Sequence, residues 1–306
     1  MDWQSEIKAA ESRLKGHVRE TPVLRVDAEW GGGPVELKLE QMQHTGSFKA
    51  RGAMNTILSR EVPAAGLVAA SGGNHGAAVA WAARHAGHNA RIYVPELAGP
   101  AKIALIRSLG ADLVVVPGAY ANAFDAARAY EAETGAMQIH AYDAEPTVAG
   151  QGTCMAEWEA QGLEADTVLI AVGGGGLIAG ALAWTQGARR IVAVEPCGCA
   201  ALHAARKAGA PTDIEVTGIA ANALGARRIG TICYDLACQY DIRSVLVEDA
   251  DIVRAQAELW QSLRQLVEPA GATALAALLS GAYRPEPGER VAVLVCGGNV
   301  APDPLA

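Results

Sequence analysis

Four consecutive glycines, Gly173, Gly174, Gly175 and Gly176, form the clearest anion-binding pattern in the chain. They lie between the apolar runs VLIAV and LIAGA, and this arrangement predicts a strand, a glycine turn and a helix. Glycines let backbone N–H groups approach a phosphate closely, and the amino end of the helix adds a favourable field. No Gly-Lys-Ser/Thr sequence follows, so the turn is not a P-loop. It predicts a phosphate site of another kind.

The same turn also fits a dinucleotide-binding pattern. Gly174, Gly176 and Ala179 satisfy G-x-G-x-x-A, and Glu195 ends the next predicted strand about 20 residues later, where an acid binds a ribose. An NAD(P)-binding dehydrogenase is therefore an alternative that the glycines alone leave open. A small-molecule binding protein without catalysis would keep the same turn.

Lys49 is the residue whose position most suggests covalent chemistry. Within QHTGSFKARGAMN, residues 43–55, Ser47 is placed to cap a helix whose first turn contains Lys49. A cation at the positive end of a helix dipole is disfavoured, which lowers the pKa of the amine and favours a nucleophile or a base. A solvated lysine on an amphipathic helix is the alternative interpretation.

Two further predicted strand ends carry polar or reactive residues. In AASGGNHGAA, residues 69–78, a Ser-Gly-Gly turn precedes a helix that opens at Asn74 and His75. This turn predicts a second nest of N–H groups for a small anion. His75 is either a general base or a capping and packing residue. In VAVLVCGGN, residues 291–299, Cys296 either presents its thiol to a ligand or is a buried, inert thiol.

The elements that must position these residues alternate along the chain. Short runs rich in Val, Ile and Leu predict strands at residues 35–40, 66–71, 90–95, 112–117, 167–172, 189–195 and 291–296. Alanine-rich segments between them predict helices at residues 75–86, 101–109, 120–134 and 177–186. This alternation predicts an α/β fold whose parallel sheets are covered on both faces. The number of units favours two interleaved lobes, with a ligand between them at the carboxyl ends of strands.

Composition excludes several other classes of protein. The 306 residues are 51% hydrophobic and 19% charged, which predicts a compact globule rather than a disordered chain. With a net charge of −8, the chain has no basic surface for nucleic acid. Residues 167–188 are uncharged over a length that could span a membrane, but the four glycines disfavour a continuous helix. Six cysteines without a signal peptide predict reduced thiols and a cytoplasmic location.

Taken together, HTGSFKARGA, SGGNHG, GGGGL and CGGN resemble the fold-type II pyridoxal-phosphate enzymes, in particular the serine/threonine dehydratase and serine racemase group. The resemblance extends from RETPVLR at Arg19 to Cys296. It implies a two-lobed fold similar to the tryptophan synthase β chain, each lobe a mostly parallel sheet flanked by helices. It also implies a large cofactor-binding domain of residues 1–50 and 145–306, a small mobile domain of residues 51–144, and a homodimer.

By this resemblance Lys49 would be the catalytic residue and would bind pyridoxal 5'-phosphate as a Schiff base. The implied cofactor contacts place the glycines at the phosphate, Asn74 at the ring hydroxyl and a thiol at the pyridine nitrogen. The full set would be Phe48, Lys49, Asn74, Gly173, Gly174, Gly175, Gly176, Leu177, Glu268 and Cys296. The substrate carboxylate would be bound by Ser71, Gly72, Gly73, Asn74 and His75. The implied activity is an ammonia-lyase that converts a β-hydroxy amino acid, such as L-threonine or L-serine, to a 2-oxo acid and ammonia.

Departures from the family pattern refine this expectation. Racemases of the group resemble Ser-Ser-Gly-Asn-His where this chain has Gly72, which disfavours serine racemase activity. No Lys or Arg in the motifs obviously pairs with a second carboxylate, so the alternative of a hydroxyaspartate dehydratase is also disfavoured. Glu195 and the Cys199 backbone match two ligands of the family's divalent-cation site (Mg or Ca), but Ala201 replaces its aspartate and leaves the cation open. The chain ends soon after Cys296, which predicts an enzyme without a regulatory domain.

Overall fold

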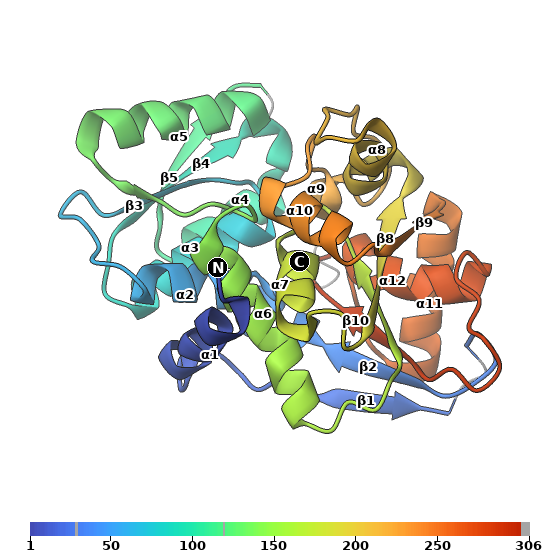
Figure 1. Ribbon diagram of the computed structural model, residues 1–306. Helices are drawn as coiled ribbons and strands as arrows, with labels where there is room; N and C mark the ends of the chain where they lie inside the picture. Colours follow the sequence, from blue (N-terminus) through green and yellow to red (C-terminus); the bar gives the residue numbers. More distant parts are fainter. Residues whose placement is uncertain (28–29, 119, 301–306) are drawn as a thin grey trace.

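Two separate β-sheets form the frame of the molecule (Figure 1). The computed structural model describes residues 1–27, 30–118 and 120–300. In the larger sheet β1 and β2 are antiparallel, and every other neighbouring pair is parallel. Its six strands lie in the order β1 (Val23–Val26), β2 (Val35–Leu39), β10 (Val291–Val295), β7 (Thr167–Ala171), β8 (Arg190–Pro196) and β9 (Arg243–Val247).

The smaller sheet is formed entirely by the segment between residues 67 and 138. Its four strands are parallel and lie in the order β5 (Asp112–Val116), β4 (Ala90–Pro95), β3 (Leu67–Ala70) and β6 (Met137–Gln138). The chain therefore begins in one sheet, builds the other and returns. This is the interleaved arrangement that the sequence predicts.

Helices pack against both sheets. On the larger sheet, α7 (Gly176–Thr185) contacts β7 and β8 and packs with α6 (Glu145–Ala160) and α10 (Thr231–Gln239). A second group consists of α12 (Pro269–Ser280), which contacts β7 to β10, and α11 (Asp249–Leu263). The remaining helical elements of this part are α1 (Trp3–Leu14), η1 (Glu40–Met42), η2 (His44–Gly46), η4 (Cys197–Cys199), α8 (Ala201–Ala208) and α9 (Ala221–Leu224).

The smaller sheet is covered in the same way. Its helix α5 (Tyr120–Thr134) contacts all four strands, whereas α3 (Asn74–His85) contacts β3 and β4. On its other side α3 packs against α2 (Lys49–Leu58) and α4 (Pro100–Ser108), which follows the short helix η3 (Glu96–Ala98). Because α2 also packs on α6, it lies between the helices of the two sheets (Figure 1).

The predicted α/β class is confirmed, and a strand or helix lies at every predicted segment. Three strands, β1, β6 and β9, were not predicted. β6 has only two residues, and the exposed Arg25 and Arg243 leave β1 and β9 without the continuous apolar runs of the predicted strands. The uncharged residues 167–188 contain strand β7, the glycine turn and helix α7. Among the described residues, no helix has the length and apolar character to cross a membrane. The domain boundaries at residues 50/51 and 144/145 stay a prediction.

A buried ionic cluster fixes α2 against the larger sheet. Arg51 of α2 donates two hydrogen bonds to Glu40, at 2.7 and 2.9 Å, and a third to the carboxylate of Glu157 at 2.9 Å. Lys38 of β2 donates to the same Glu157 carboxylate at 2.6 Å. The side chains of Arg51 and Glu40 are 1% and 0% exposed. Burial favours the neutral form of Glu40, but the adjacent Arg51 outweighs it and holds the pKa of that carboxyl below its ordinary value.

Candidate functional site

Lys49 is the first residue of α2, and its side chain is partly buried. The Nζ atom donates a hydrogen bond of 2.8 Å to the carbonyl oxygen of Ala141. Burial lowers the pKa of Lys49 to about 8, while the neighbouring Cys296 opposes this shift. The predicted direction of the shift is confirmed, although desolvation is its largest cause. The surface-lysine interpretation is disfavoured, because the partly buried amine bonds to a backbone carbonyl and the residue lines a pocket.

The predicted capping role of Ser47 is wrong. Phe48 occupies the cap position, and the buried Oγ of Ser47 has no hydrogen-bond partner. Ser47 is instead extended and forms a β-bridge with Gly297, directly after β10. The N–H of Phe48 then donates to the Cys296 carbonyl at 3.3 Å. Backbone pairing therefore brings Lys49 beside the end of the central strand.

The glycine turn, residues 173–176, lines the same pocket as Lys49. The predicted residues that line this pocket are Phe48, Lys49, Asn74, Gly173, Gly174, Gly175, Gly176, Leu177 and Cys296. Side chains at the turn have no room, since a Cβ on Gly173 would lie 2.9 Å from the Leu224 Cα and one on Gly174 would overlap the Tyr142 ring. Gly175 also has a left-handed φ of 93°. The turn therefore exposes backbone at the amino end of α7.

Three side chains that the resemblance assigns to the cofactor ring lie next to one another. The Nδ2 group of Asn74 donates to Glu268 Oε1, and the Asn74 Oδ1 atom accepts from Asn299 at 2.9 Å. These bonds fix the orientation of the Asn74 amide. The Cys296 Sγ donates to the Ala270 carbonyl at 3.3 Å, and burial raises the pKa of this thiol. Cys296 is therefore a neutral thiol that faces the pocket.

The SGGNH turn, residues 71–75, connects β3 to α3 as predicted. The Ser71 Oγ accepts a hydrogen bond of 3.2 Å from the Gly73 N–H, which closes the turn on itself. The ring of His75 is buried, and its Nε2 bonds to the Ile139 carbonyl at 2.8 Å. Burial lowers the pKa of His75 to about 3, so the ring is neutral and Nε2 is the donor. This arrangement favours the packing interpretation of the His75 side chain over a general base.

Glu195 and Cys199 lie outside this pocket and make bonds of their own. The Glu195 carboxylate is fully buried and accepts from the N–H groups of Leu202 and His203 and from the Ser244 hydroxyl, at 2.7 to 2.9 Å. It stabilises the start of α8 and is not free to bind a ribose, so the dinucleotide alternative lacks its acid. The Cys199 thiol donates to the Thr217 carbonyl at 3.2 Å. The described residues contain no cluster of three or more His, Cys, Asp or Glu that could hold a metal ion.

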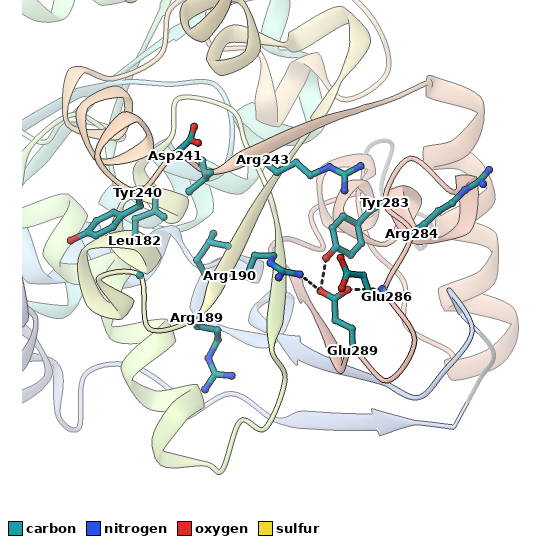
Figure 2. Close-up of a pocket in the computed structure, with 13 residues that line it drawn as sticks. Leu182, Arg189, Arg190, Tyr240, Asp241, Arg243, Tyr283, Arg284, Glu286 and Glu289 are labelled. Atoms are coloured by element: carbon teal, nitrogen blue, oxygen red, sulfur yellow. Dashed lines mark hydrogen bonds and ion pairs between the residues drawn. The ribbon is translucent and has the colours of Figure 1, made fainter.

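A larger hollow lies at the opposite edge of the larger sheet (Figure 2). It contains Arg190 and Arg243, the first residues of β8 and β9, whereas the glycine turn follows the carboxyl end of β7. Figure 2 shows that Arg190 and the Tyr283 hydroxyl both point to Glu289. Because Glu289 already pairs with Arg190 and the hollow is remote from Lys49, it is not part of the candidate site.

Two contributors to the site were not predicted from the sequence. Ala141 acts through its backbone carbonyl, which no side-chain pattern reveals. Lys102 of α4 lies beside the SGGNH turn, since a Cβ built on Gly73 would be 3.9 Å from its Nζ atom. The sequence places Lys102 on an ordinary amphipathic helix, and only the packing of α4 against α3 brings it to the turn.

We expect Gly72→Ser to destabilise the fold. A Cβ at position 72 would overlap the Ala98 side chain and lie 3.2 Å from Val94 Cγ1. Overpacking of this kind usually reduces the free energy of unfolding by about 1–3 kcal/mol. Urea denaturation of Gly72→Ser and of Gly72→Ser/Ala98→Gly measures the effect, and the second variant should recover part of the loss. A Gly72→Ser protein as stable as the wild type would contradict the proposed clash.

The raised pKa of Glu268 should make the stability of the protein depend on pH. Burial raises the pKa of this carboxyl from 4.5 to about 7. Its contribution to stability is therefore complete below about pH 4.5 and is lost as the pH rises through 7. Glu268→Gln keeps an acceptor for Asn74 without the titration. It should gain about 2 kcal/mol over the wild type between pH 5 and 8.5, measured by urea denaturation. A difference that does not depend on pH would show that Glu268 is ionised throughout.

These features describe an α/β protein whose pocket combines a glycine turn with a partly buried lysine of lowered pKa, and they fit pyridoxal 5'-phosphate. Lys49 would supply an amine for the cofactor aldehyde, and the glycine turn would leave its backbone N–H groups open to the cofactor phosphate. Cys296 lies in the same pocket. The family model of pyridoxal-phosphate dependent enzymes matches residues 14–297, and the chain belongs to this family.

Individual relatives agree with this assignment. The chain is 36% identical to a phenylserine dehydratase of Ralstonia pickettii over 302 residues, which covers 96% of this chain and 92% of the relative. It is 34% identical to an L-threonine ammonia-lyase of Geobacter sulfurreducens, covering 96% and 75% of the two chains. The solved structure of maize serine racemase superposes with a TM-score of 0.91 at 31% identity, covering 97% and 93%. The predicted resemblance is confirmed, and nothing in these comparisons supports a dehydrogenase.

Proposed function

We propose that this protein is a pyridoxal-phosphate dependent ammonia-lyase that converts a β-hydroxy amino acid, with L-threonine and L-serine the preferred candidates, to a 2-oxo acid and ammonia. The observation that carries the proposal is that Lys49, the glycine turn and Cys296 line one pocket. The similarity to an L-threonine ammonia-lyase and to a phenylserine dehydratase supports the class of reaction and adds phenylserine to the candidate substrates.

The cofactor would be held at three places. The N–H groups of the glycine turn and Leu177 would bind its phosphate, and Lys49 would bind its aldehyde carbon covalently. Phe48, Asn74, Glu268 and Cys296 would surround the ring, with the Asn74 amide at the ring hydroxyl. When bound, the cofactor supplies an electron-withdrawing system that stabilises negative charge at the substrate Cα.

The residues of the chain perform the proton transfers and the positioning. With a pKa of about 8, the amine of Lys49 has a neutral fraction at physiological pH that can accept the Cα proton. The N–H groups of the SGGNH turn would bind the substrate carboxylate and so orient the Cα–H bond toward Lys49. Burial raises the pKa of Cys296, so its neutral thiol would not hold the nitrogen of a bound cofactor ring protonated as a carboxylate would. This favours elimination over transamination.

The SGGNH turn also favours elimination over racemisation. A racemase needs a proton donor on the face of the substrate opposite the lysine, and Gly72 supplies none. The surroundings of Gly72 leave no space for a serine in this conformation, because Ala98 and Val94 pack against it. We infer that racemisation is at most a minor activity.

We further propose a homodimer, a cytoplasmic location and a small domain of residues 51–144 that moves relative to the rest. The family resemblance supports the dimer and the domain motion, and the six cysteines support a reducing compartment. Light scattering after size-exclusion chromatography tests the dimer, and a monomeric mass would refute it.

A substrate panel tests the proposed function directly. The cofactor-loaded protein is incubated with L-threonine, L-serine, phenylserine and 3-hydroxyaspartate, and the release of ammonia and 2-oxo acid is measured. We expect stoichiometric release from at least one of the first three. Borohydride treatment should attach the cofactor to Lys49, which peptide mass analysis detects. A protein that carries the cofactor on Lys49 but releases no ammonia from any of the four would refute the lyase assignment.

A further inference from the structure

Lys102 is a cation next to the SGGNH turn that neither the proposed mechanism nor the predicted site includes. It is the third residue of α4, and α4 packs against α3, the helix that the turn opens. A Cβ built on Gly73 would lie 3.9 Å from Lys102 Nζ and 3.2 Å from the Asn222 carbonyl oxygen. The ammonium group and the first residues of α9 therefore border the same small space above Gly73.

The described residues provide no hydrogen-bond or ion-pair partner for this ammonium. Lys102 is partly buried, and burial lowers its pKa, while the charge of Glu268 opposes the shift. Glu268 is itself hydrogen-bonded to Asn74 and forms no ion pair with Lys102. Partial burial removes some of the water around this ammonium group, so a nearby anion would stabilise it. The position of Lys102 thus calls for a negatively charged ligand at the turn.

Two anion-binding turns lie close together here, and α9 separates them. The first residues of α9 border Gly73, whereas its last residue, Leu224, packs against Gly173 of the glycine turn. An anion at Gly173 is thus separated from Lys102 by α9. An anion beside Lys102 would therefore be one bound at the SGGNH turn, next to Gly73. For the proposed reaction this anion is the α-carboxylate, the one negative group that every β-hydroxy amino acid carries.

We propose that Lys102 is a substrate-binding residue whose ammonium group pairs with the α-carboxylate held by the SGGNH turn. This inference rests on the proposed function, because it takes the ligand of the turn to be an amino acid. The carboxylate would then be bound by backbone N–H groups of the turn and, from the side of α4, by the ammonium group of Lys102.

The test compares Lys102→Met with Lys102→Arg and with Lys207→Met, a matched loss of an exposed lysine in the last turn of α8. A charge-assisted hydrogen bond to a substrate typically changes affinity by about 10- to 100-fold. We expect Lys102→Met to raise the KM of the best substrate by about 10- to 100-fold and to change kcat less than about threefold. Lys102→Arg should recover most of the affinity, and Lys207→Met should match the wild type.

A binding measurement keeps the test independent of the elimination reaction. L-Alanine and its amide lack a leaving group and differ in the carboxylate charge, and both are titrated into the cofactor-loaded proteins by calorimetry. The wild type should prefer L-alanine over the amide, and Lys102→Met should lose at least about tenfold of that preference. This readout holds even if the substrate panel shows no ammonia release, so failure of the lyase assignment and failure of the Lys102 proposal are distinguishable.

Three results would overturn the Lys102 proposal. The first is an unchanged preference for L-alanine over its amide in Lys102→Met, which would show that Lys102 does not contact the carboxylate. The second is a fall in kcat with no change in KM. The third is a loss of binding confined to 3-hydroxyaspartate, which would assign Lys102 to a second carboxylate on the substrate side chain.

Discussion

Lys49→Ala is expected to lower turnover of the best β-hydroxy amino acid by at least about 10²- to 10⁴-fold. The reason is that, in the proposed function, this one amine would both bind the cofactor aldehyde and accept the Cα proton. The pocket offers no obvious substitute, since the His75 ring is bonded to the Ile139 carbonyl and the Cys296 thiol is neutral. Initial rates of 2-oxo acid formation measure the loss, and borohydride should no longer attach the cofactor to the protein.

Two controls separate this effect from a general loss of structure. Lys207→Ala removes an exposed lysine and should leave the rate unchanged. A small primary amine added to Lys49→Ala should restore part of the activity, because it supplies the missing base in solution. If Lys49→Ala kept more than a tenth of the wild-type rate while folded, the catalytic role of Lys49 would be wrong.

Glu40→Gln should cause the largest loss of stability among the substitutions discussed. The side chain of Glu40 is fully buried and accepts two hydrogen bonds from Arg51, which is itself 1% exposed. Removing one member of a buried ion pair leaves an uncompensated charge and usually reduces the free energy of unfolding by about 3–5 kcal/mol. Urea denaturation measures the change. Because Arg51 and Lys49 share α2, some loss of cofactor affinity should accompany it.

A matched exposed pair provides the control. Glu164 lies 3.8 Å from Arg290 with both side chains more than half exposed, so Glu164→Gln should change stability far less. In the double variant Glu40→Gln/Arg51→Met the charge on position 51 is also removed, and stability should recover in part. Equal effects of Glu40→Gln and Glu164→Gln would show that the buried cluster is not a special source of stability.

Local sequence patterns correctly predicted the turns of the site and the strands and helices that flank them. The apolar run before Gly173 and the alanine-rich run after Gly176 predict β7 and α7, and the turn between them is a consequence of those two elements. The same holds for the SGGNH turn between β3 and α3. Lys49 lies in the first turn of α2 as predicted, but the predicted cap at Ser47 was wrong. Ser47 pairs with Gly297 of a segment far along the chain, and this pairing outweighs its capping preference.

The sequence by itself determined the α/β class, the two glycine-containing turns and the lysine in the first turn of a helix, because each depends on neighbours within a few residues. Only the tertiary structure decided which charged groups are bonded within the protein and which remain free to bind a ligand. It buried Glu195 at the start of α8 and paired Arg51 with Glu40, and it placed Lys102 without a partner among the described residues. The physical reason is that desolvation and ion pairing depend on contacts between segments that are distant in the sequence. A local sequence pattern does not contain this information.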